Sequence, residues 1–355
     1  MSKKVLRFSI FIVLLLISVT SEGLQKEPCN LFPIIQNGKE GYIDETGKII
    51  IEPQFDSAYE FTDGVARIWI SQNTPLVGGR RIADIAGYID TTGEVIIKPQ
   101  FYPAGEFSEG LAAVSLNDIF LKTGNFKYGF IDKSGTFVIE PQFSRAESFS
   151  EGLAAVEIGD KWGFINKQGK TIVEPQFDSA RSFSEGLAQV RIDGNTVYID
   201  KTGKTFLVIK DSWAGDFNEG LARIFVEKGS NGKWGYIDQH GIMVIKPQFD
   251  EAANFSEGLA AIKMNDKVGF INKAGNIEIA PQFWSSSGFS DGLARIMVKK
   301  YGKRVTGYID KNGKVIINPQ FDLAWDFCNG LAHVKIGDEY GYINKSGQFI
   351  WEPSK

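Results

Sequence analysis

The sequence predicts an all-β protein: a tandem array of about nine units, each of about 34 residues with three strands. Two recurring phrases support this prediction. One is F-S-E-G-L-A, as at Phe149–Ala154, and the other is Gly-aromatic-Ile-acid/amide, as at Gly163–Asn166. A period this regular is typical of repeat architectures, in which each unit buries its apolar residues against its neighbours.

The spacing between the two phrases is constant on one side and variable on the other. The Leu or Val of G-L-A always follows the Gly of the other phrase by 24 positions. The return interval is 10 from Leu153 to Gly163 and 14 from Leu293 to Gly307, and it varies in steps of four. A hairpin explains this step, because lengthening both strands by two residues leaves every side chain on its original face.

The elements of one unit can be placed in order. Leu153–Ile158 and Trp162–Asn166 are predicted as two strands around a tight turn. Lys170–Glu174 is β-branched and predicts a third strand, which ends at Pro175 because proline cannot donate to a ladder. A tight bend or an irregular fourth strand is expected where three residues recur at a spacing of three: Phe177, Ala180 and Phe183.

The array could be open or closed. It begins and ends with the same hairpin, which favours an open solenoid-like superhelix, and nine units would be many for a propeller. The alternative is a closed propeller-like ring, in which Cys29 and Cys328 would lie in neighbouring units and could form a disulfide. The open form is the favoured prediction.

Two phrases resemble the bacterial WG-repeat (KWG-repeat) family: Lys161–Ile165 and Lys233–Ile237. The surrounding G-K-x-V-I-x-P-Q-F and F-S-E-G-L-A phrases are similar as well, and the resemblance runs from Leu31 to the end. It implies a β-rich repeat domain with no catalytic residues to carry over. The family's Trp is replaced in the other units by Glu40, Ala86, Tyr128, Thr196, Val268, Thr306 and Tyr340.

The beginning of the chain is typical of export. Residues 1–21 combine basic residues, an apolar run and small residues, which predicts a signal peptide. Residues 22–30 are then a linker, and residues 31–355 are the repeat domain. We expect a periplasmic, cell-surface or secreted protein without a transmembrane helix once the signal is removed. The net charge of −4 argues against a nucleic-acid partner.

The sequence predicts no catalytic, metal or cofactor site. The acid of F-S-E-G and the Asx of the second phrase recur in almost every unit, so both are interpreted as turn formers. His240 and His333 are solitary. The chain is therefore expected to be a non-enzymatic protein with an extended interaction surface; the alternatives are a carbohydrate-active enzyme and a structural envelope component.

The extended hairpins are the candidate binding elements, because insertions in repeat proteins often map to the binding face. Their partner is expected to be a protein or an anionic envelope component. The candidate residues at these tips are Arg80, Arg81, Phe120, Phe126, Lys299, Lys300, Tyr301, Lys303 and Arg304. Unit five is a separate departure, since it has Val197 for the Gly and Ile209-Lys210-Asp211 for P-Q-F.

Overall fold

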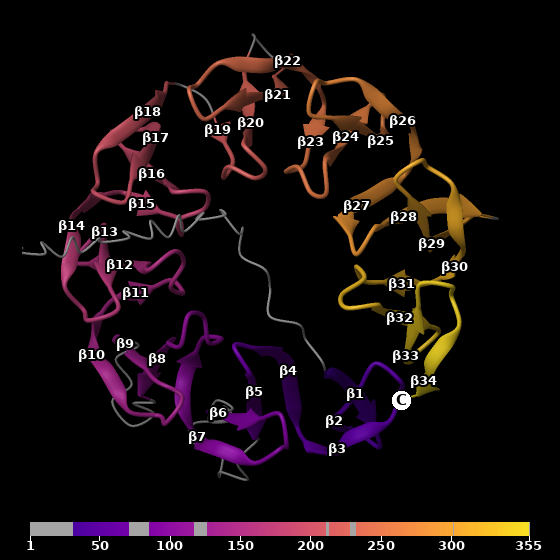
Figure 1. Ribbon diagram of the computed structural model, residues 1–355, viewed down its shortest axis with the longest axis horizontal. Helices are drawn as coiled ribbons and strands as arrows, with labels where there is room; N and C mark the ends of the chain where they lie inside the picture. Colours follow the sequence, from indigo (N-terminus) through magenta and orange to yellow (C-terminus); the bar gives the residue numbers. More distant parts are fainter. Residues whose placement is uncertain are drawn as a thin grey trace, which may run out of the picture.

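The computed structural model describes residues 31–70, 85–116, 126–210, 213–227, 232–300 and 302–354. Over these ranges the chain forms strands and turns without a helix, so none of it is a candidate membrane-spanning helix. The strands form small antiparallel sheets arranged around a central axis (Figure 1). The predicted all-β tandem array is therefore confirmed. The predicted signal peptide and linker, residues 1–30, lie outside the described residues.

The sheets follow one another along the chain. Unit one contains β1 (Phe32–Gln36), β2 (Lys39–Ile43) and β3 (Ile49–Phe55). Units two and three share a seven-stranded sheet of β4 (Ser57–Thr62), β5 (Val65–Ile70), β6 (Ile85–Asp90), β7 (Val95–Ala104), β8 (Ala112–Leu116), β9 (Tyr128–Ile131) and β10 (Phe137–Phe143). Unit four contains β11 (Arg145–Ala146), β12 (Leu153–Ile158), β13 (Lys161–Asn166) and β14 (Thr171–Phe177).

The remaining sheets each have four strands. Unit five contains β15 (Ser179–Ala180), β16 (Leu187–Ile192), β17 (Asn195–Asp200) and β18 (Thr205–Ile209), and unit six contains β19 (Trp213–Ala214), β20 (Leu221–Val226), β21 (Lys233–Asp238) and β22 (Met243–Phe249). Unit seven contains β23 (Glu251–Ala252), β24 (Leu259–Met264), β25 (Lys267–Asn272) and β26 (Ile277–Phe283). Unit eight contains β27 (Ser285–Ser290), β28 (Leu293–Lys300), β29 (Lys303–Asp310) and β30 (Val315–Phe321), and unit nine contains β31 (Leu323–Ala324), β32 (Leu331–Ile336), β33 (Glu339–Asn344) and β34 (Phe349–Ser354).

In units four to seven and in unit nine, a two-residue strand is added to the three predicted strands. In unit four, β11 pairs with β12, β12 with β13 and β13 with β14, all antiparallel. β11 follows the P-Q-F phrase of the preceding unit but pairs with the hairpin of its own sheet. The irregular fourth strand is thus present: it follows P-Q-F in the chain but pairs in the next sheet. This arrangement connects successive sheets through the chain.

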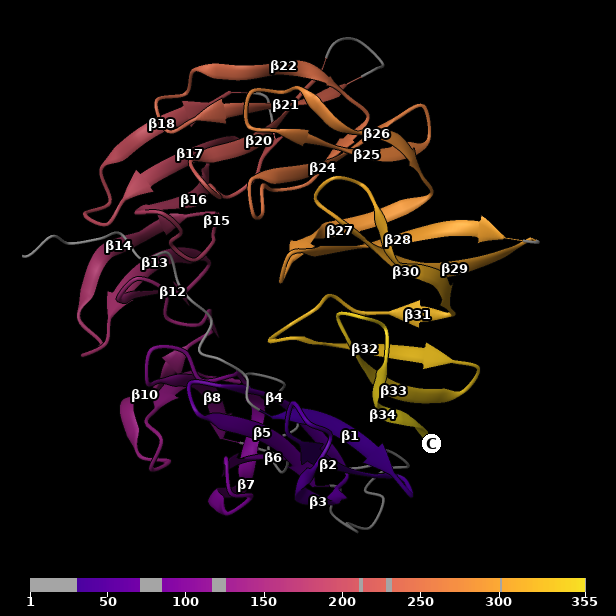
Figure 2. The ribbon, with the colours of Figure 1, turned by 45° about the vertical axis from the view of Figure 1, so that its right-hand side comes forward.

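Hairpin length follows the predicted rule in unit eight but not in unit six, where the interval is also 14 and β20 and β21 still pair over six residues each. β12 and β13 pair over six residues each, ending at Ile158↔Lys161. β28 and β29 pair over eight residues each, ending at Lys300↔Lys303, and this hairpin projects outward from the array of sheets (Figure 2). The added four residues therefore lengthen both strands by two and preserve the facing of the side chains, as predicted.

The Gly of the second phrase is required by a bulge in the outer strand. A Cβ at Gly163 would lie 2.5 Å from the carbonyl oxygen of Val173 and 2.8 Å from the nitrogen of Pro175. The register between β13 and β14 shifts at this point, so the P-Q-F segment lies close over the Gly backbone. In unit five the ladder is regular from Thr196 to Tyr198, with Val197 opposite Val208, and it shifts only between Tyr198 and Ile199. Unit five lacks both the Gly and P-Q-F, because the Gly is needed only where the P-Q-F segment lies close over the backbone.

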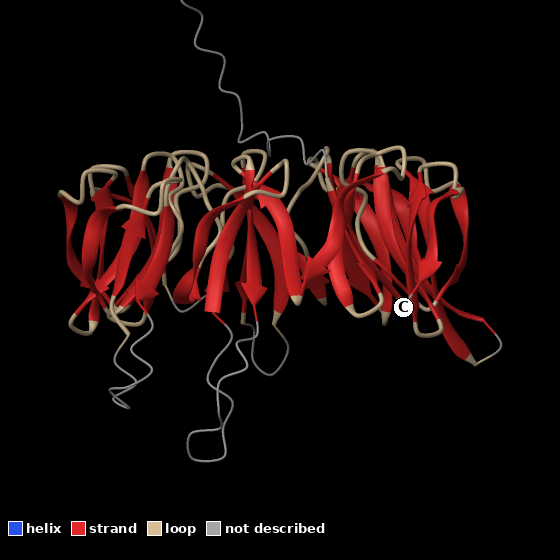
Figure 3. Cartoon of the chain, turned by 90° about the horizontal axis from the view of Figure 1, so that it is seen from below, coloured by secondary structure: helices blue, strands red, loops and turns tan. Residues whose placement is uncertain are grey.

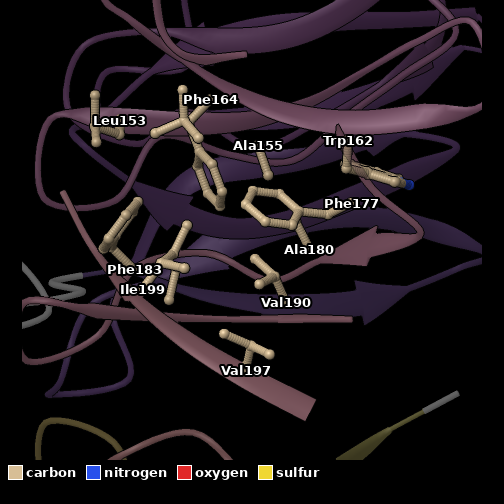
Figure 4. Packing of buried hydrophobic residues seen from close by; sticks show 12 residues of the cluster. Leu153, Ala155, Trp162, Phe164, Phe177, Ala180, Phe183, Val190, Val197 and Ile199 are labelled. Atoms are coloured by element: carbon tan, nitrogen blue, oxygen red, sulfur yellow. The ribbon is translucent and has the colours of Figure 1, made fainter. Parts of the chain in front are cut away.

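The core lies between successive sheets. Figure 4 shows the interface of units four and five, where Phe164, Phe177 and Phe183 meet Val190 and Ile199. Phe164 and Phe183 are almost fully buried, with ring centroids 4.9 Å apart. Full burial of one such side chain contributes about 1.5–3 kcal/mol. Each unit is therefore stabilised chiefly by its neighbours.

The F-S-E-G turns connect neighbouring units by hydrogen bonds. Glu151 and Gly152 both have positive φ, at 54° and 87°, as the tightest hairpin turns require. The Glu151 carboxylate accepts a hydrogen bond from the Gly186 backbone N–H at 3.0 Å and pairs with Lys201 at 3.1 Å. Ser150 Oγ donates to the carbonyl oxygen of Phe183 at 2.7 Å. The repeated acid is thus both the predicted turn former and a contact to the next unit.

The first and last units are in contact. In Figures 1 and 2, β1 lies beside β33. The Tyr342 hydroxyl donates to the carbonyl oxygen of Pro33 at 2.8 Å, and the rings of Phe32 and Tyr342 are 5.6 Å apart. Cys328 of unit nine packs against a cluster of buried residues that includes Leu31. We call this contact between units one and nine the seam.

Candidate binding site

The described residues include five of the predicted tip residues. Lys299 and Lys300 lie at the end of β28, Lys303 and Arg304 begin β29, and Phe126 precedes β9. Four others lie outside the described residues, as does one member of the proposed disulfide: Arg80, Arg81, Phe120, Tyr301 and Cys29. The structure therefore describes the basic tip of unit eight most fully.

A tryptophan that the sequence did not single out organises this tip. Trp284 follows P-Q-F of unit seven, and two cations that face each other across the β28–β29 ladder contact its ring. Lys299 Nζ is 4.1 Å from the ring centroid, and the guanidinium carbon of Arg304 is 5.1 Å from it. Trp284 is 37% exposed, so the three side chains form an accessible surface. We call Trp284, Lys299 and Arg304 the unit-eight cluster.

A cavity of about 520 Å³ adjoins the unit-eight cluster. Trp284 lines one part of it, and Arg223 and Trp234 of unit six line another. The Arg223 guanidinium lies over the Trp234 ring at 5.1 Å. Lys263 also lines the cavity and is paired with Glu251 at 2.7 Å. This hollow combines two tryptophan rings with two cationic side chains and one carboxylate.

Two further contacts of aromatic side chains occur at the same end of the sheets. Arg191 of unit five lies over Trp213 of unit six at 4.7 Å, and Trp213 is 60% exposed. Phe126, one of the predicted residues, contacts Tyr102 with ring centroids 5.8 Å apart. The register places these residues near the end where the hairpin strands are joined, which is the lower edge in Figure 3. We call this edge the hairpin end.

The repeated carboxylates are engaged in turns. Asp132 Oδ1 accepts backbone hydrogen bonds from Ser134 at 2.9 Å and Thr136 at 3.1 Å. The hydrogen bond from the Ser134 hydroxyl, together with these backbone donors, lowers the pKa of Asp132 below its usual value. Within the described ranges, no three His, Cys, Asp or Glu residues are grouped as metal ligands would be.

The two histidines have different surroundings. His240 is exposed, and its Nδ1 lies 3.8 Å from Asp238. His333 is stacked between Trp325 at 4.7 Å and Tyr342 at 4.8 Å, and burial lowers its pKa to about 4. His333 is therefore uncharged near neutral pH and part of an aromatic stack at the seam.

These features define a repetitive β-protein whose variable hairpins carry aromatic and cationic side chains. The family model described as "WG containing repeat" matches residues 41–69, 87–118, 128–162, 162–195, 234–267, 269–303 and 307–340. These matches cover more than half of the chain, which therefore belongs to the WG-repeat family. They leave out residues 196–233, which include the part of unit five where the Gly and P-Q-F are missing.

The curated proteins contain no match to this chain. Among solved structures, one entitled "Crystal structure of the eukaryotic initiation factor" is similar with a TM-score of 0.63 and 11% identity, over 93% of this chain and 96% of that one. The β-propeller domain of the trilobed protease from Pyrococcus furiosus aligns with a TM-score of 0.39 and 9% identity, over 72% and 99%. The first of these likenesses shows a shared fold only.

Proposed function

We propose that this chain is an exported, non-enzymatic binding protein whose hairpin end binds an acidic polysaccharide. The observation that carries the proposal is the exposed Trp284 ring in contact with both Lys299 and Arg304. An aromatic face packs against the C–H face of a sugar ring, and the two cations supply partners for its carboxylate groups. The basic cluster is local, because the chain as a whole has a charge of −4.

The distribution of variation along the chain supports this location. The F-S-E-G and Asx turns are nearly the same in every unit and are occupied by hydrogen bonds within the protein. The hairpin end differs from unit to unit in length and in aromatic residues. A surface that differs locally can select a ligand, whereas a repeated turn offers every unit the same contacts.

We also propose that the array closes into a propeller-like ring, the alternative to the open superhelix that the sequence favoured. Support comes from the seam, where Tyr342 donates to Pro33 over a sequence separation of 309 residues. Leu331 and Tyr342 of unit nine share an apolar cluster with Phe32 and Ile34 of unit one. Closure would leave each sheet with neighbours on both sides, which removes the terminal units that an open array must protect.

Binding to polygalacturonate, with neutral dextran as the reference polymer, tests the binding proposal. We expect Trp284→Ala to weaken polygalacturonate binding about fivefold to tenfold, as loss of one partly exposed cation–π contact predicts. The double variant Lys299→Ala/Arg304→Ala should weaken it further and flatten its dependence on salt.

The matched control is Lys161→Ala/Lys233→Ala, which removes the same charge from the hairpins of units four and six. These lysines pair with Asp178 and Asp250 at the protein surface. If the control and the unit-eight variant weaken binding equally, only net charge matters and the proposed site is wrong. Binding to anionic lipid vesicles but not to polygalacturonate would contradict the assigned ligand class.

The competing function is hydrolysis of a carbohydrate, which requires a pair of carboxylates dedicated to catalysis. The acids that recur in F-S-E-G have structural partners instead, as Glu151 does with Gly186 and Lys201. We therefore expect polygalacturonate to be recovered at full length after incubation with the protein. Shortened products that disappear when Glu60 or Glu251 is replaced by Gln would favour the enzyme.

A further inference from the structure

The outer strand of unit five lacks features that interrupt the outer strand elsewhere. In unit four, β14 contains the proline of P-Q-F, and its register with β13 shifts twice. β18 of unit five has no proline and a single shift, and Leu207, Val208 and Ile209 pair with successive residues of β17. Proline and bulges are two devices by which proteins prevent another strand from pairing with a sheet edge. Unit five has lost the proline and one of the bulges.

β18 has one side that no described strand covers. It is the last strand in the order of its sheet, β15-β16-β17-β18, and it lies on the outer side of the array (Figure 1). β17 pairs with one side of it, and no strand in the described ranges pairs with the other. An edge strand presents a row of N–H and C=O groups on its unpaired side. β18 therefore offers backbone donors and acceptors to a further strand.

The side chains along this edge are apolar where other units are mostly polar. Val208 is 44% exposed, and Phe206 on the same strand is 49% exposed. The residues that stand at the position of Val208 in the other units are Glu52, Lys98, Glu140, Glu174, Lys246, Ala280, Asn318 and Glu352. Unit five thus lacks the charge that most units place on their outer strand.

The neighbouring unit extends the apolar surface. Ile242 of unit six is 62% exposed. A Cβ at Gly241 would lie 2.6 Å from Cδ1 of Leu207, so the turn that precedes Ile242 lies against β18. The residues at the position of Ile242 in the other units are all polar: Lys48, Glu94, Thr136, Lys170, Lys204, Asn276, Lys314 and Gln348. We call Phe206, Val208 and Ile242, together with the unpaired side of β18, the unit-five edge.

The charges at the two ends of β18 select among occupants. Lys204 and Lys210 flank the strand, both are exposed, and neither forms an ion pair within the described ranges. A second copy of this chain could pair antiparallel with Phe206 opposite Val208, but the same register places Lys204 opposite Lys210. Like charges directly opposite each other destabilise a sheet. The edge therefore favours a different strand with an acidic residue near each end.

We propose that the unit-five edge binds an extended segment of a partner protein by strand addition. Alternate apolar side chains of that segment pack on Phe206, Val208 and Ile242, and its acidic ends pair with Lys204 and Lys210. Backbone hydrogen bonds supply affinity in this mode of recognition, and the alternate side chains supply specificity. The site lies on the outer strands, away from the hairpin end, and it does not depend on the proposed polysaccharide binding.

Fluorescence anisotropy with a labelled peptide, E-T-V-T-V-T-E, tests the proposal on the full chain. We expect this peptide to bind at least about fivefold more tightly than K-T-V-T-V-T-K, because the lysines at the ends of β18 attract it. Two further peptides carry N-methyl groups on one or the other alternating set of backbone nitrogens. Only one of these should lose binding, since alternate N–H groups of a strand point to the same side.

A pair of substitutions locates the site. Val208→Glu/Ile242→Lys introduces residue types found at these positions in other units, so it should leave the melting temperature unchanged and weaken peptide binding at least about tenfold. The matched control is Ile316→Glu/Val315→Lys in unit eight, where both residues are exposed on an outer strand that keeps its proline and both register shifts. This control has the same net charge and should leave binding unchanged.

Five results would overturn the proposal. Equal weakening by the two double variants would place binding elsewhere. Equal affinity for the acidic and basic peptides would remove the role of the lysines, and binding of both N-methylated peptides would show that backbone pairing plays no part. Absence of peptide binding to protein with the native melting temperature would show that the edge does not accept a strand. A dimer in analytical ultracentrifugation that Val208→Glu/Ile242→Lys converts to a monomer would assign the edge to a second copy of this chain.

Discussion

Replacing Gly163 by Ala tests whether the Gly–P-Q-F bulge holds each unit together. The added Cβ would lie 2.5 Å from the Val173 carbonyl oxygen and 2.8 Å from the Pro175 nitrogen. Ordinary contacts of a Cβ begin at 3.4 Å, so β14 would have to move by nearly 1 Å. Both contacting atoms belong to the backbone, and no side-chain rotation can relieve the clash.

The magnitude follows from the cost of overpacking. Forcing extra volume into a packed region costs typically about 1–3 kcal/mol and more where backbone must move. We expect Gly163→Ala to lower the free energy of unfolding by about 3 kcal/mol. The matched control is Val197→Ala, at the equivalent position of unit five, where the ladder already accommodates a Cβ. Loss of two buried methyl groups there should cost about 1.5 kcal/mol.

Urea unfolding followed by far-ultraviolet circular dichroism measures both values. The difference between the variants is the informative quantity, since both end in alanine at the same place in a unit. If Gly163→Ala costs no more than Val197→Ala, the bulge does not require glycine. The explanation of why unit five lost the Gly and P-Q-F together would then be wrong.

Four further predictions follow from named contacts. Tyr236→Phe should lower the free energy of unfolding by about 1 kcal/mol, because the Tyr236 hydroxyl donates to the Ala253 carbonyl oxygen at 2.7 Å. Phe164 fills the same buried position in unit four without a hydroxyl. Equal stability of Tyr236→Phe and the native protein would contradict the prediction. Glu151→Ala should destabilise the protein by about 1–2 kcal/mol and Lys201→Ala by less than about 1 kcal/mol. The reason is that the hydrogen bond from Gly186 to Glu151 contributes more than the exposed ion pair with Lys201. The reverse order in urea unfolding would argue against Glu151 as a contact between units. The pKa of His333 in the folded protein is about 4, below its usual 6.5, so only the unfolded chain binds a proton at this residue between these pH values. The free energy of unfolding should therefore fall as the pH drops from about 6.5 towards 4. His333→Phe should flatten this pH dependence of the melting temperature. Peptide mapping of the protein without reductant tests the predicted Cys29–Cys328 disulfide, because Cys328 packs against the cluster that includes Leu31, two residues after Cys29. Recovery of the two cysteines in separate peptides would remove the disulfide prediction.

The sequence predicted those elements that repeat. Side-chain alternation and the four-residue steps identified the hairpins, including the longer pair β28 and β29, because a slipped register would expose the core. The β-branched run before P-Q-F identified the third strand. The partner of the fourth strand was not predicted, since a two-residue strand such as β15 has no periodicity to read. Only the register with β16 assigns it to the following sheet.

The candidate site was predicted in part. Lys299 and Arg304 were found because they depart from the repeat, but Trp284 lies 15 residues before Lys299 and in the preceding unit's phrase. A comparison of the residue after P-Q-F across units could have found it, because Trp284 stands where Asp178 and Asp250 stand in others. The seam could not be found in this way, since Tyr342 and Pro33 are 309 positions apart.

The repeat itself limits where a ligand-binding site can lie. An array of similar units gives most interfaces similar apolar packing and most F-S-E-G turns similar hydrogen bonds. A ligand would therefore find nearly the same surface on each unit. A ligand of defined chemistry requires a place where that equivalence ends. The hairpin end of unit eight provides one, because longer strands place cations over Trp284 without disturbing the core. The seam is a second such place, because it brings Tyr342 of the last unit against Phe32 and Pro33 of the first.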